Sequence, residues 1–163
     1  MNVTISPSHP NGQIVIPPSK SIAHRAIICA CLADGTSTLH NIDTSDDMSA
    51  TISAMEAVGA KIERKDKTLI IKGVANTLKL QKPVIDCIES GSTLRFLIPL
   101  FSLTNECVSF VGHNRLLYRP QSIYEKLFKE RNIPFSHSTE KIEVNGSLTS
   151  GEYILDGDVS SQF

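Results

Sequence analysis

The sequence predicts an α/β (α+β) fold made of repeated βαβαββ units, two of them complete and a third only begun. The first observation is internal similarity: residues 19–25 and 90–96 each place two serines around one residue and lead into an apolar helical stretch. The second is that the same order of elements follows both segments, at an offset of 71 positions from 19 to 90. The third is that residues 151–163 repeat the opening of a unit. Such self-similarity is typical of repeat proteins, whose units bury apolar faces against one another.

The first unit covers about residues 19–82. Its expected elements are a helix after Ser19, a strand at 36–40, a helix at 45–58 and two strands at 60–64 and 68–72. The helix at 45–58 carries its apolar side chains on one face at helical period. Gly59 follows it, at the position where left-handed backbone commonly ends a helix.

The second unit covers about residues 83–150. Its expected elements are a strand at 84–86, a helix after Ser90, a strand at 107–111, a helix at 122–131 and two strands at 134–137 and 141–144. Asn132 takes the place of Gly59, and Asn is the next best residue for left-handed backbone. The two units are therefore expected to share one architecture.

Residues 1–18 precede the repeats and are expected to form a strand pair, at 2–5 and 13–16, which ends at Pro17-Pro18. Residues 19–163 are expected to form a partial domain.

A third unit is expected to begin at residues 151–163. Residues 153–156 resemble the strand at 84–86, and the serine-rich segment 157–163 lies where the earlier helices start. The chain stops there, which indicates a truncated domain. An incomplete unit leaves apolar helix faces uncovered, so self-association or marginal stability is expected.

Composition excludes several classes of protein. The chain has 163 residues, 40% of them hydrophobic, a formal net charge of -1 and no Trp. Nucleic acid is not an expected partner, because its binders need a basic surface or aromatic stacking platforms. No apolar run is long enough for a membrane span, and residues 1–10 do not resemble a signal peptide. The cysteines and histidines form no ligand cluster, so no metal is expected and a reducing, cytoplasmic location is favoured.

The residues at the helix starts are the candidate ligand-binding groups. A helix N-terminus presents free N–H groups and the positive end of the macrodipole, which together favour phosphate. Lys20 adds a point charge, Arg25 lies on the same helical face as Ser21, and Gly91 permits close approach of a ligand. Each residue also has a simpler interpretation: the serines as N-caps, Lys20 as a solvated lysine and Arg25 as the partner of a surface carboxylate.

Several segments resemble those of 5-enolpyruvylshikimate-3-phosphate synthases across essentially the whole chain. The matching segments are Pro18–Ala26, Leu32–Ser37, Ser45–Asp47, Gly91–Arg95, Tyr118–Pro120 and Gly157–Phe163. The resemblance implies the enolpyruvyl transferase fold, with two domains of three units each. It also implies that residues 1–18 belong to the opposite domain in the complete enzyme.

The implied reaction moves the enolpyruvyl group of phosphoenolpyruvate to the 5-hydroxyl of shikimate-3-phosphate and releases phosphate, with no cofactor or metal. By resemblance, Lys20 contacts both substrates and assists proton transfer. The residues implied to bind shikimate-3-phosphate are Lys20, Ser21, Arg25, Ser160, Ser161 and Gln162. Those implied to bind phosphoenolpyruvate are Lys20, Gly91, Ser92 and Arg119. Arg95, just inside its helix, is interpreted as structural.

Two departures from the family pattern matter. Residues 89–93 read Glu-Ser-Gly-Ser-Thr where many members have Asn-Ala-Gly-Thr-Ala, which puts sensitivity to glyphosate in doubt. The acid/base carboxylates of the family lie beyond Phe163, so the missing C-terminal part is an expected partner and the chain alone is expected to be inactive. Three alternatives stay open: a UDP-N-acetylglucosamine enolpyruvyl transferase, a non-catalytic phosphate-binding or assembly module, and a structural repeat protein with ordinary N-caps.

Overall fold

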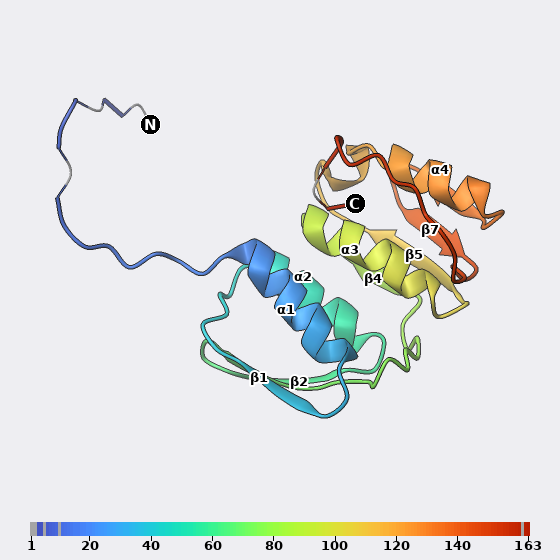
Figure 1. Cartoon of the computed structure of the whole chain (residues 1–163), viewed down its shortest axis with the longest axis horizontal. Coiled ribbons are helices and arrows are strands. Elements are labelled where there is room, and N and C mark those ends of the chain that lie inside the picture. The colour runs from blue at the N-terminus through green and yellow to red at the C-terminus, as the bar shows by residue number, and fades with distance from the viewer. Residues whose placement is uncertain (1–2, 5, 10, 161) are drawn as a thin grey trace.

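The computed structural model describes residues 3–4, 6–9, 11–160 and 162–163. The two repeats appear as two neighbouring α/β units (Figure 1). The first contains α1 (Lys20–Leu32), β1 (Thr36–Leu39), α2 (Asp46–Glu56), β2 (Lys61–Lys65) and β3 (Thr68–Lys72). The second contains β4 (Val84–Asp86), α3 (Gly91–Ser102), β5 (Cys107–Val111), the short 3₁₀ helix η1 (Leu116–Tyr118), α4 (Ser122–Glu130), β6 (Phe135–His137) and β7 (Ile142–Asn145). None of the described helices is long and apolar enough to cross a membrane.

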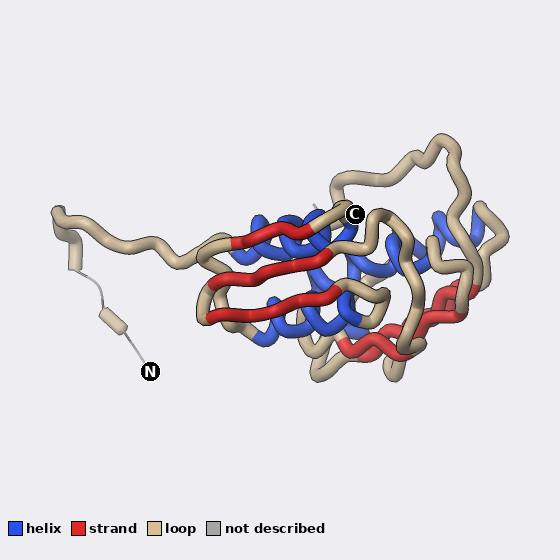
Figure 2. The backbone as a smooth tube through the Cα atoms, turned by 90° about the horizontal axis from the view of Figure 1, so that it is seen from below, coloured by secondary structure: helices blue, strands red, loops and turns tan. Residues whose placement is uncertain are grey.

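Each unit has one sheet with its helices on one face, as the view from below shows for the first unit (Figure 2). The first sheet has the strand order β1-β3-β2 and is antiparallel. The second has the order β4-β5-β7-β6, with β4 parallel to β5. An inner strand of each sheet alternates in burial. Leu69 and Ile71 are buried in β3, the middle strand of the first sheet, and Ile142 and Val144 are buried in β7, one of the two inner strands of the second. This period-two pattern aims the apolar face of each sheet at the helices.

The predicted helix boundaries are close to those observed, and the local chemistry explains them. Ser19 and Ser90 are the N-caps of α1 and α3, and their hydroxyls accept the backbone N–H of Ile22 and Thr93 at 3.4 and 3.1 Å. After α2 and α4 the chain turns through left-handed backbone, at Gly59 with φ of 104° and Asn132 with φ of 55°. The repeat is thus reproduced down to its turns.

One apolar core joins the two units, because α1, α2 and α3 pack against each other above the sheets. Ile27, Met48 and Leu94 are fully buried, one from each of these helices. Behind α3, Phe101 and Phe110 meet edge to face with ring centroids 5.8 Å apart. The two units therefore form a single packed body.

The strand pair expected at 2–5 and 13–16 is not formed by the described residues of that segment, which lead away from the body of the molecule (Figure 1). Ile14, Val15 and Ile16 are at least 75% exposed. A strand needs a partner for its backbone N–H and C=O groups, and this segment contacts no sheet edge. Asn2 and Ile5 lie outside the described residues. Membership of 1–18 in an opposite domain stays a prediction.

The strand expected at 153–156 is also absent: these residues form a loop. Tyr153 instead lies under the guanidinium of Arg131, which is 4.2 Å from the ring centroid. Residues 157–160 and 162–163 likewise contain no helix. In the second unit the opening strand β4 pairs with β5, and 153–156 has no such partner among the described residues. The second unit has the predicted βαβαββ order, whereas the first begins at α1 and has no opening strand among the described residues. Residues 151–160 and 162–163 form a segment that lies across α3 and α4.

Candidate functional site

Lys20 is the first residue of α1, and its ammonium meets the first turn of α2. Nζ lies 2.9 Å from Oδ2 of Asp47. The hydrogen bond to Asp47 and the negative charge of Asp47 raise the pKa of Lys20, so the amine stays protonated at neutral pH. The side chain is still 55% exposed, so one face of the ammonium is open to a ligand.

Ser21 and Arg25 lie one helical turn apart on the exposed side of α1, as predicted. Nη1 of Arg25 donates to the carbonyl of Ser21 at 2.9 Å. Its guanidinium also stacks over the ring of Phe96 in α3, 4.6 Å from the centroid. Arg25 therefore lies at the contact between the two repeats, held by α3 rather than by a surface carboxylate.

The start of α3 forms a second part of the site. A Cβ atom added to Gly91 would lie 2.4 Å from Nη1 of Arg119, so the guanidinium of Arg119 rests directly on the bare backbone of Gly91. A real Cβ essentially never approaches another atom so closely, so any larger residue at position 91 would displace the guanidinium, and glycine is what permits this contact. Two residues predicted to bind one substrate are thus brought together from segments 28 positions apart.

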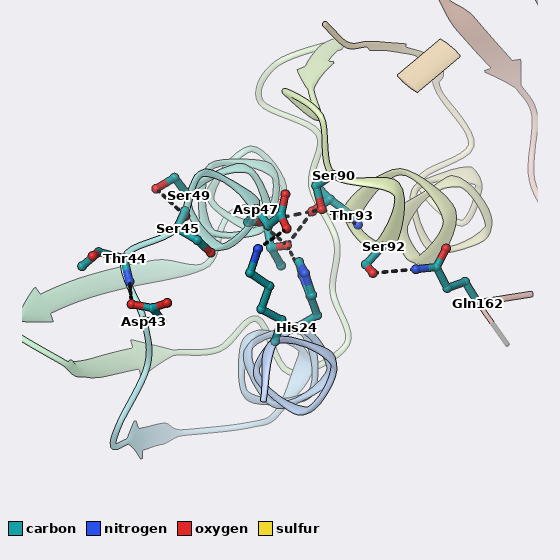
Figure 3. A network of polar contacts seen from close by, with 12 residues as sticks. His24, Asp43, Thr44, Ser45, Asp47, Ser49, Ser90, Ser92, Thr93 and Gln162 are labelled. Atoms are coloured by element: carbon teal, nitrogen blue, oxygen red, sulfur yellow. Dashed lines mark hydrogen bonds and ion pairs between the residues drawn. The ribbon is translucent and has the colours of Figure 1, made fainter. Parts of the chain in front are cut away.

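The last described residues return to the same place. Nε2 of Gln162 donates to Oγ of Ser92 at 2.7 Å, as Figure 3 shows. Oε1 of Gln162 accepts from Nη1 of Arg95 at 3.1 Å, and the hydroxyl of Ser160 accepts from the same nitrogen at 3.3 Å. The predicted residues Ser92, Ser160 and Gln162 are therefore in one cluster. Ser161 lies outside the described residues.

Arg95, which the sequence interpretation set down as structural, is a member of this cluster. Besides Ser160 and Gln162 it binds the carbonyl of Pro120, with Nη2 at 3.2 Å, and its guanidinium lies 4.6 Å from the ring centroid of Phe163. Burial and the nearby charge of Arg119 lower its pKa. Burial is the larger cause, and the Arg119 charge adds to it because the two guanidinium groups lie near each other. Two neighbouring guanidinium groups are an arrangement that a multiply charged anion neutralises.

The sequence interpretation also gave no site role to three residues, of which His24 and Thr93 are buried and Asp47 is partly exposed. Asp47, His24 and Thr93 hold the helix starts together, and Figure 3 shows their side chains between α1, α2 and α3. Helical spacing was the available signal, because His24 follows Lys20 by one turn. Within the described part of the chain, no group of three or more His, Cys, Asp or Glu side chains is arranged to hold a metal ion.

The geometry defines a class of protein: an α/β repeat protein whose helix starts carry hydroxyl groups and an excess of cations, which are the groups that recognise small anions. Lys20, Arg25, Arg95 and Arg119 lie around these starts, and Asp47 is the carboxylate that pairs with one of them. Arginine matches carboxylate and phosphate in a two-pronged geometry, whereas lysine acts as a point charge.

Comparison with known proteins identifies the family. The family model for EPSP synthase (3-phosphoshikimate 1-carboxyvinyltransferase) matches residues 6–163, and the chain belongs to that family. It is 45% identical to a 3-phosphoshikimate 1-carboxyvinyltransferase of Clostridium kluyveri over 99% of the chain and 38% of the relative. It is 47% identical to the enzyme of the same name from Clostridium perfringens (strain SM101), with the same coverage. The chain thus spans about 38% of the length of these curated relatives.

A solved structure shows the same fold. The chain matches EPSP synthase from Acinetobacter baumannii with a TM-score of 0.76, at 24% identity, over 93% of this chain and 37% of that one. The predicted α/β fold and the predicted family are both confirmed. The role of each site residue stays a prediction.

Proposed function

We propose that this chain supplies one side of an active site that transfers the enolpyruvyl group of phosphoenolpyruvate to the 5-hydroxyl of shikimate-3-phosphate, a step of aromatic amino-acid biosynthesis. One observation carries the proposal: side chains from three separate family motifs meet at the start of α3. Arg119 rests on Gly91, and Gln162 binds Ser92 at 2.7 Å. A structural repeat protein with ordinary N-caps requires neither contact.

In this proposal shikimate-3-phosphate is bound by Ser160, Ser161 and Gln162, with the two serines near its phosphate. Ser21 and Arg25 bind the same substrate from α1. Hydroxyl and amide donors together with a guanidinium are the groups that recognise phosphate. Arg95 holds Ser160 and Gln162 in place through Nη1, at 3.3 and 3.1 Å. The cluster would therefore be largely formed before the substrate arrives.

Phosphoenolpyruvate would be bound by Arg119, Gly91, Ser92 and Lys20. The raised pKa of Lys20 supports a role as a cation that contacts both anionic substrates. Its help in transferring a proton to the methylene carbon rests on the family resemblance, because a higher pKa makes the ammonium a weaker acid. The 5-hydroxyl oxygen then bonds to the central carbon of the enol and gives up its proton, which ends on the departing phosphate. Loss of this phosphate and of a methyl proton from the tetrahedral adduct restores the double bond and returns the proton that was first added to the methylene carbon.

The chain alone is expected to bind but not to turn over. It spans about 38% of the curated relatives, so groups that complete the site are expected in the rest of their length. Four free cysteines, two exposed and two buried, support a reducing compartment, and we place the protein in the cytoplasm.

Calorimetric titration with shikimate-3-phosphate tests the proposal. Lys20→Ala and Arg25→Ala are expected to weaken binding at least about tenfold, because each removes a charged hydrogen-bond partner of an anion. Lys61→Ala, which removes an exposed lysine from β2, is the matched control and should leave binding unchanged. Equal binding by all variants, or a preference for UDP-N-acetylglucosamine, would contradict the assignment. Phosphate release by the chain alone would contradict the expected inactivity.

A further inference from the structure

A buried polar network, made of His24, Thr51, Thr93 and Ser90, lies under the candidate site. Nδ1 of His24 is 2.7 Å from Oγ1 of Thr51. Oγ1 of Thr51 is 2.7 Å from Oγ1 of Thr93, which is 2.7 Å from Oγ of Ser90. None of the four residues is more than 2% exposed. The network thus crosses α1, α2 and α3 inside an otherwise apolar core.

The members lie next to site residues along their helices. His24 is one turn after Lys20 in α1, Thr51 is one turn after Asp47 in α2, and Thr93 is three residues after the cap Ser90. The exposed Lys20–Asp47 ion pair and the buried His24–Thr51 contact are therefore successive layers of the same α1–α2 contact (Figure 3).

The network also ties α3 to the backbone that carries Asp47. Oγ1 of Thr51 and Oγ1 of Thr93 both lie within hydrogen-bonding distance of the carbonyl of Asp47, at 3.2 and 3.4 Å. Thr93 further donates its backbone N–H to Ser90 at 3.1 Å. The start of α3, where Gly91 and Ser92 contact Arg119 and Gln162, is thus fixed relative to the first turn of α2.

The supply of protons selects one form of the imidazole. Each hydroxyl has one proton to donate, so Thr93 can donate to Ser90, and Thr51 can donate to Thr93 or to the Asp47 carbonyl. The remaining contact, between His24 and Thr51, is then satisfied only when Nδ1 carries a proton. A form protonated only at Nε2 would take the Thr51 proton, so that Thr51 could donate neither to Thr93 nor to the Asp47 carbonyl.

We propose that His24 is a positioning residue of the anion site, which in its neutral Nδ1–H form locks the starts of α1, α2 and α3 in one relative position. The inference rests on the proposed function, because it explains how that same site is held. His24 contacts no substrate in this account and acts through Thr51 and Thr93.

The electrostatic surroundings agree with a neutral ring. Burial lowers the pKa of His24, and Lys20 and Arg25 on α1 act in the same direction, while Asp47 on α2 opposes them. α3 contributes the uncharged hydroxyl of Thr93. At neutral pH the ring therefore has a single N–H, as the proton assignment requires.

Two conservative variants separate positioning from packing. In His24→Asn the amide nitrogen can occupy the place of Nδ1, whereas in His24→Gln it reaches the place of Nε2. We expect the Asn variant to bind shikimate-3-phosphate within about threefold of the parent chain, and the Gln variant to lose about tenfold, the cost of an unmet buried hydrogen bond. Thr51→Ser should behave like the Asn variant, and Thr51→Val like the Gln variant.

The test combines two spectra. Nitrogen-15 spectra of the imidazole report its tautomer, and amide spectra without ligand report the backbone at Lys20 and Ser92. The proposal expects an Nδ1–H ring, and Ser92 signals that move in His24→Gln but not in His24→Asn. An Nε2–H ring, or equal spectra for the two variants, overturns it. If the parent chain binds no shikimate-3-phosphate while the spectra behave as expected, the proposed function fails and the positioning role stands.

Discussion

The starts of α1 and α3 are two versions of one motif that obtain a positive charge in different ways. In α1 the residue between the two serines is Lys20, which carries the charge itself and leaves its ammonium open. In α3 the equivalent residue is Gly91, and its bare backbone accepts the guanidinium of Arg119 from a distant loop. The first serine of each pair caps its helix, so the second remains for other contacts. The two units therefore share the capped helix start but differ in the source of the positive charge beside it.

The substitution Gly91→Ala is expected to have the largest effect on this contrast between α1 and α3. The new methyl group would lie 2.4 Å from Nη1 of Arg119, and because that is the end of a flexible side chain we expect Arg119 to swing away. The free energy of unfolding should fall by no more than about 1 kcal/mol, whereas binding of phosphoenolpyruvate or phosphate should weaken about tenfold or more.

Gly157→Ala is the matched control, since a Cβ there meets nothing within 4 Å. Calorimetry and thermal melts of both variants give the two readouts. Unchanged anion binding by Gly91→Ala would mean that Arg119 does not act through the start of α3.

A second test removes the ion pair between Lys20 and Asp47 at the start of α1. Asp47→Asn removes the hydrogen bond and the negative charge that raise the pKa of Lys20, so that pKa should fall toward its ordinary value of 10.5. Carbon-13 shifts of the lysine ε-methylene group, followed against pH, measure it. Because the pair is largely exposed, stability should change by less than about 1 kcal/mol. A Lys20 pKa that is the same in both proteins would show that the ion pair is not formed in solution.

The buried histidine gives a third, pH-dependent effect. Its folded pKa is below the ordinary 6.5, so the unfolded chain binds more protons and stability falls as pH drops below about 6.5. The loss can reach about 1.4 kcal/mol per pH unit until the folded pKa is passed. Urea unfolding at pH 7.5 and 5.5 measures it. His24→Asn should remove this part of the acid sensitivity, and an equally steep dependence in that variant would assign it to other groups.

The smallest expected difference between the two units is in the reactivity of their cysteine thiols, which should be alike. Each unit has one exposed cysteine, Cys29 or Cys107, and one buried cysteine, Cys31 or Cys87. Burial raises the pKa of both buried thiols to about 12, which suppresses the reactive thiolate. A thiol reagent at pH 8 should therefore react quickly with two cysteines and slowly with the other two. Rapid reaction of Cys87 would indicate local opening beside the start of α3.

The sequence alone predicted the repeat, because hydrophobic period and turn residues are local properties. Gly59 and Asn132 are examples, since each sits where a left-handed residue ends a helix segment. The strands expected at 13–16 and 153–156 failed for the opposite reason. A strand requires a partner that a local pattern cannot supply, and neither segment has one among the described residues.

The same limit applies to the site. Lys20, Gly91 and Arg119 could be named from motifs, but the role of Arg95 depends on contacts with Ser160 and Gln162, more than sixty positions away. The apolar groove beside Arg95, about 600 Å³ in volume and lined by residues such as Phe96, Leu100 and Leu127, likewise emerged only from packing. This groove is open to solvent, as expected for an uncovered apolar face. Self-association or marginal stability stays a prediction.

The most direct measurement is an NMR titration of the isotope-labelled chain with shikimate-3-phosphate, with UDP-N-acetylglucosamine as the control ligand. The account predicts saturable shifts at Lys20, Ser21, Arg25 and Gln162 with the first ligand, and none with the second. Saturable shifts that appear equally with both ligands, or that spare these residues, would contradict the central claim that the helix starts form a site for this substrate.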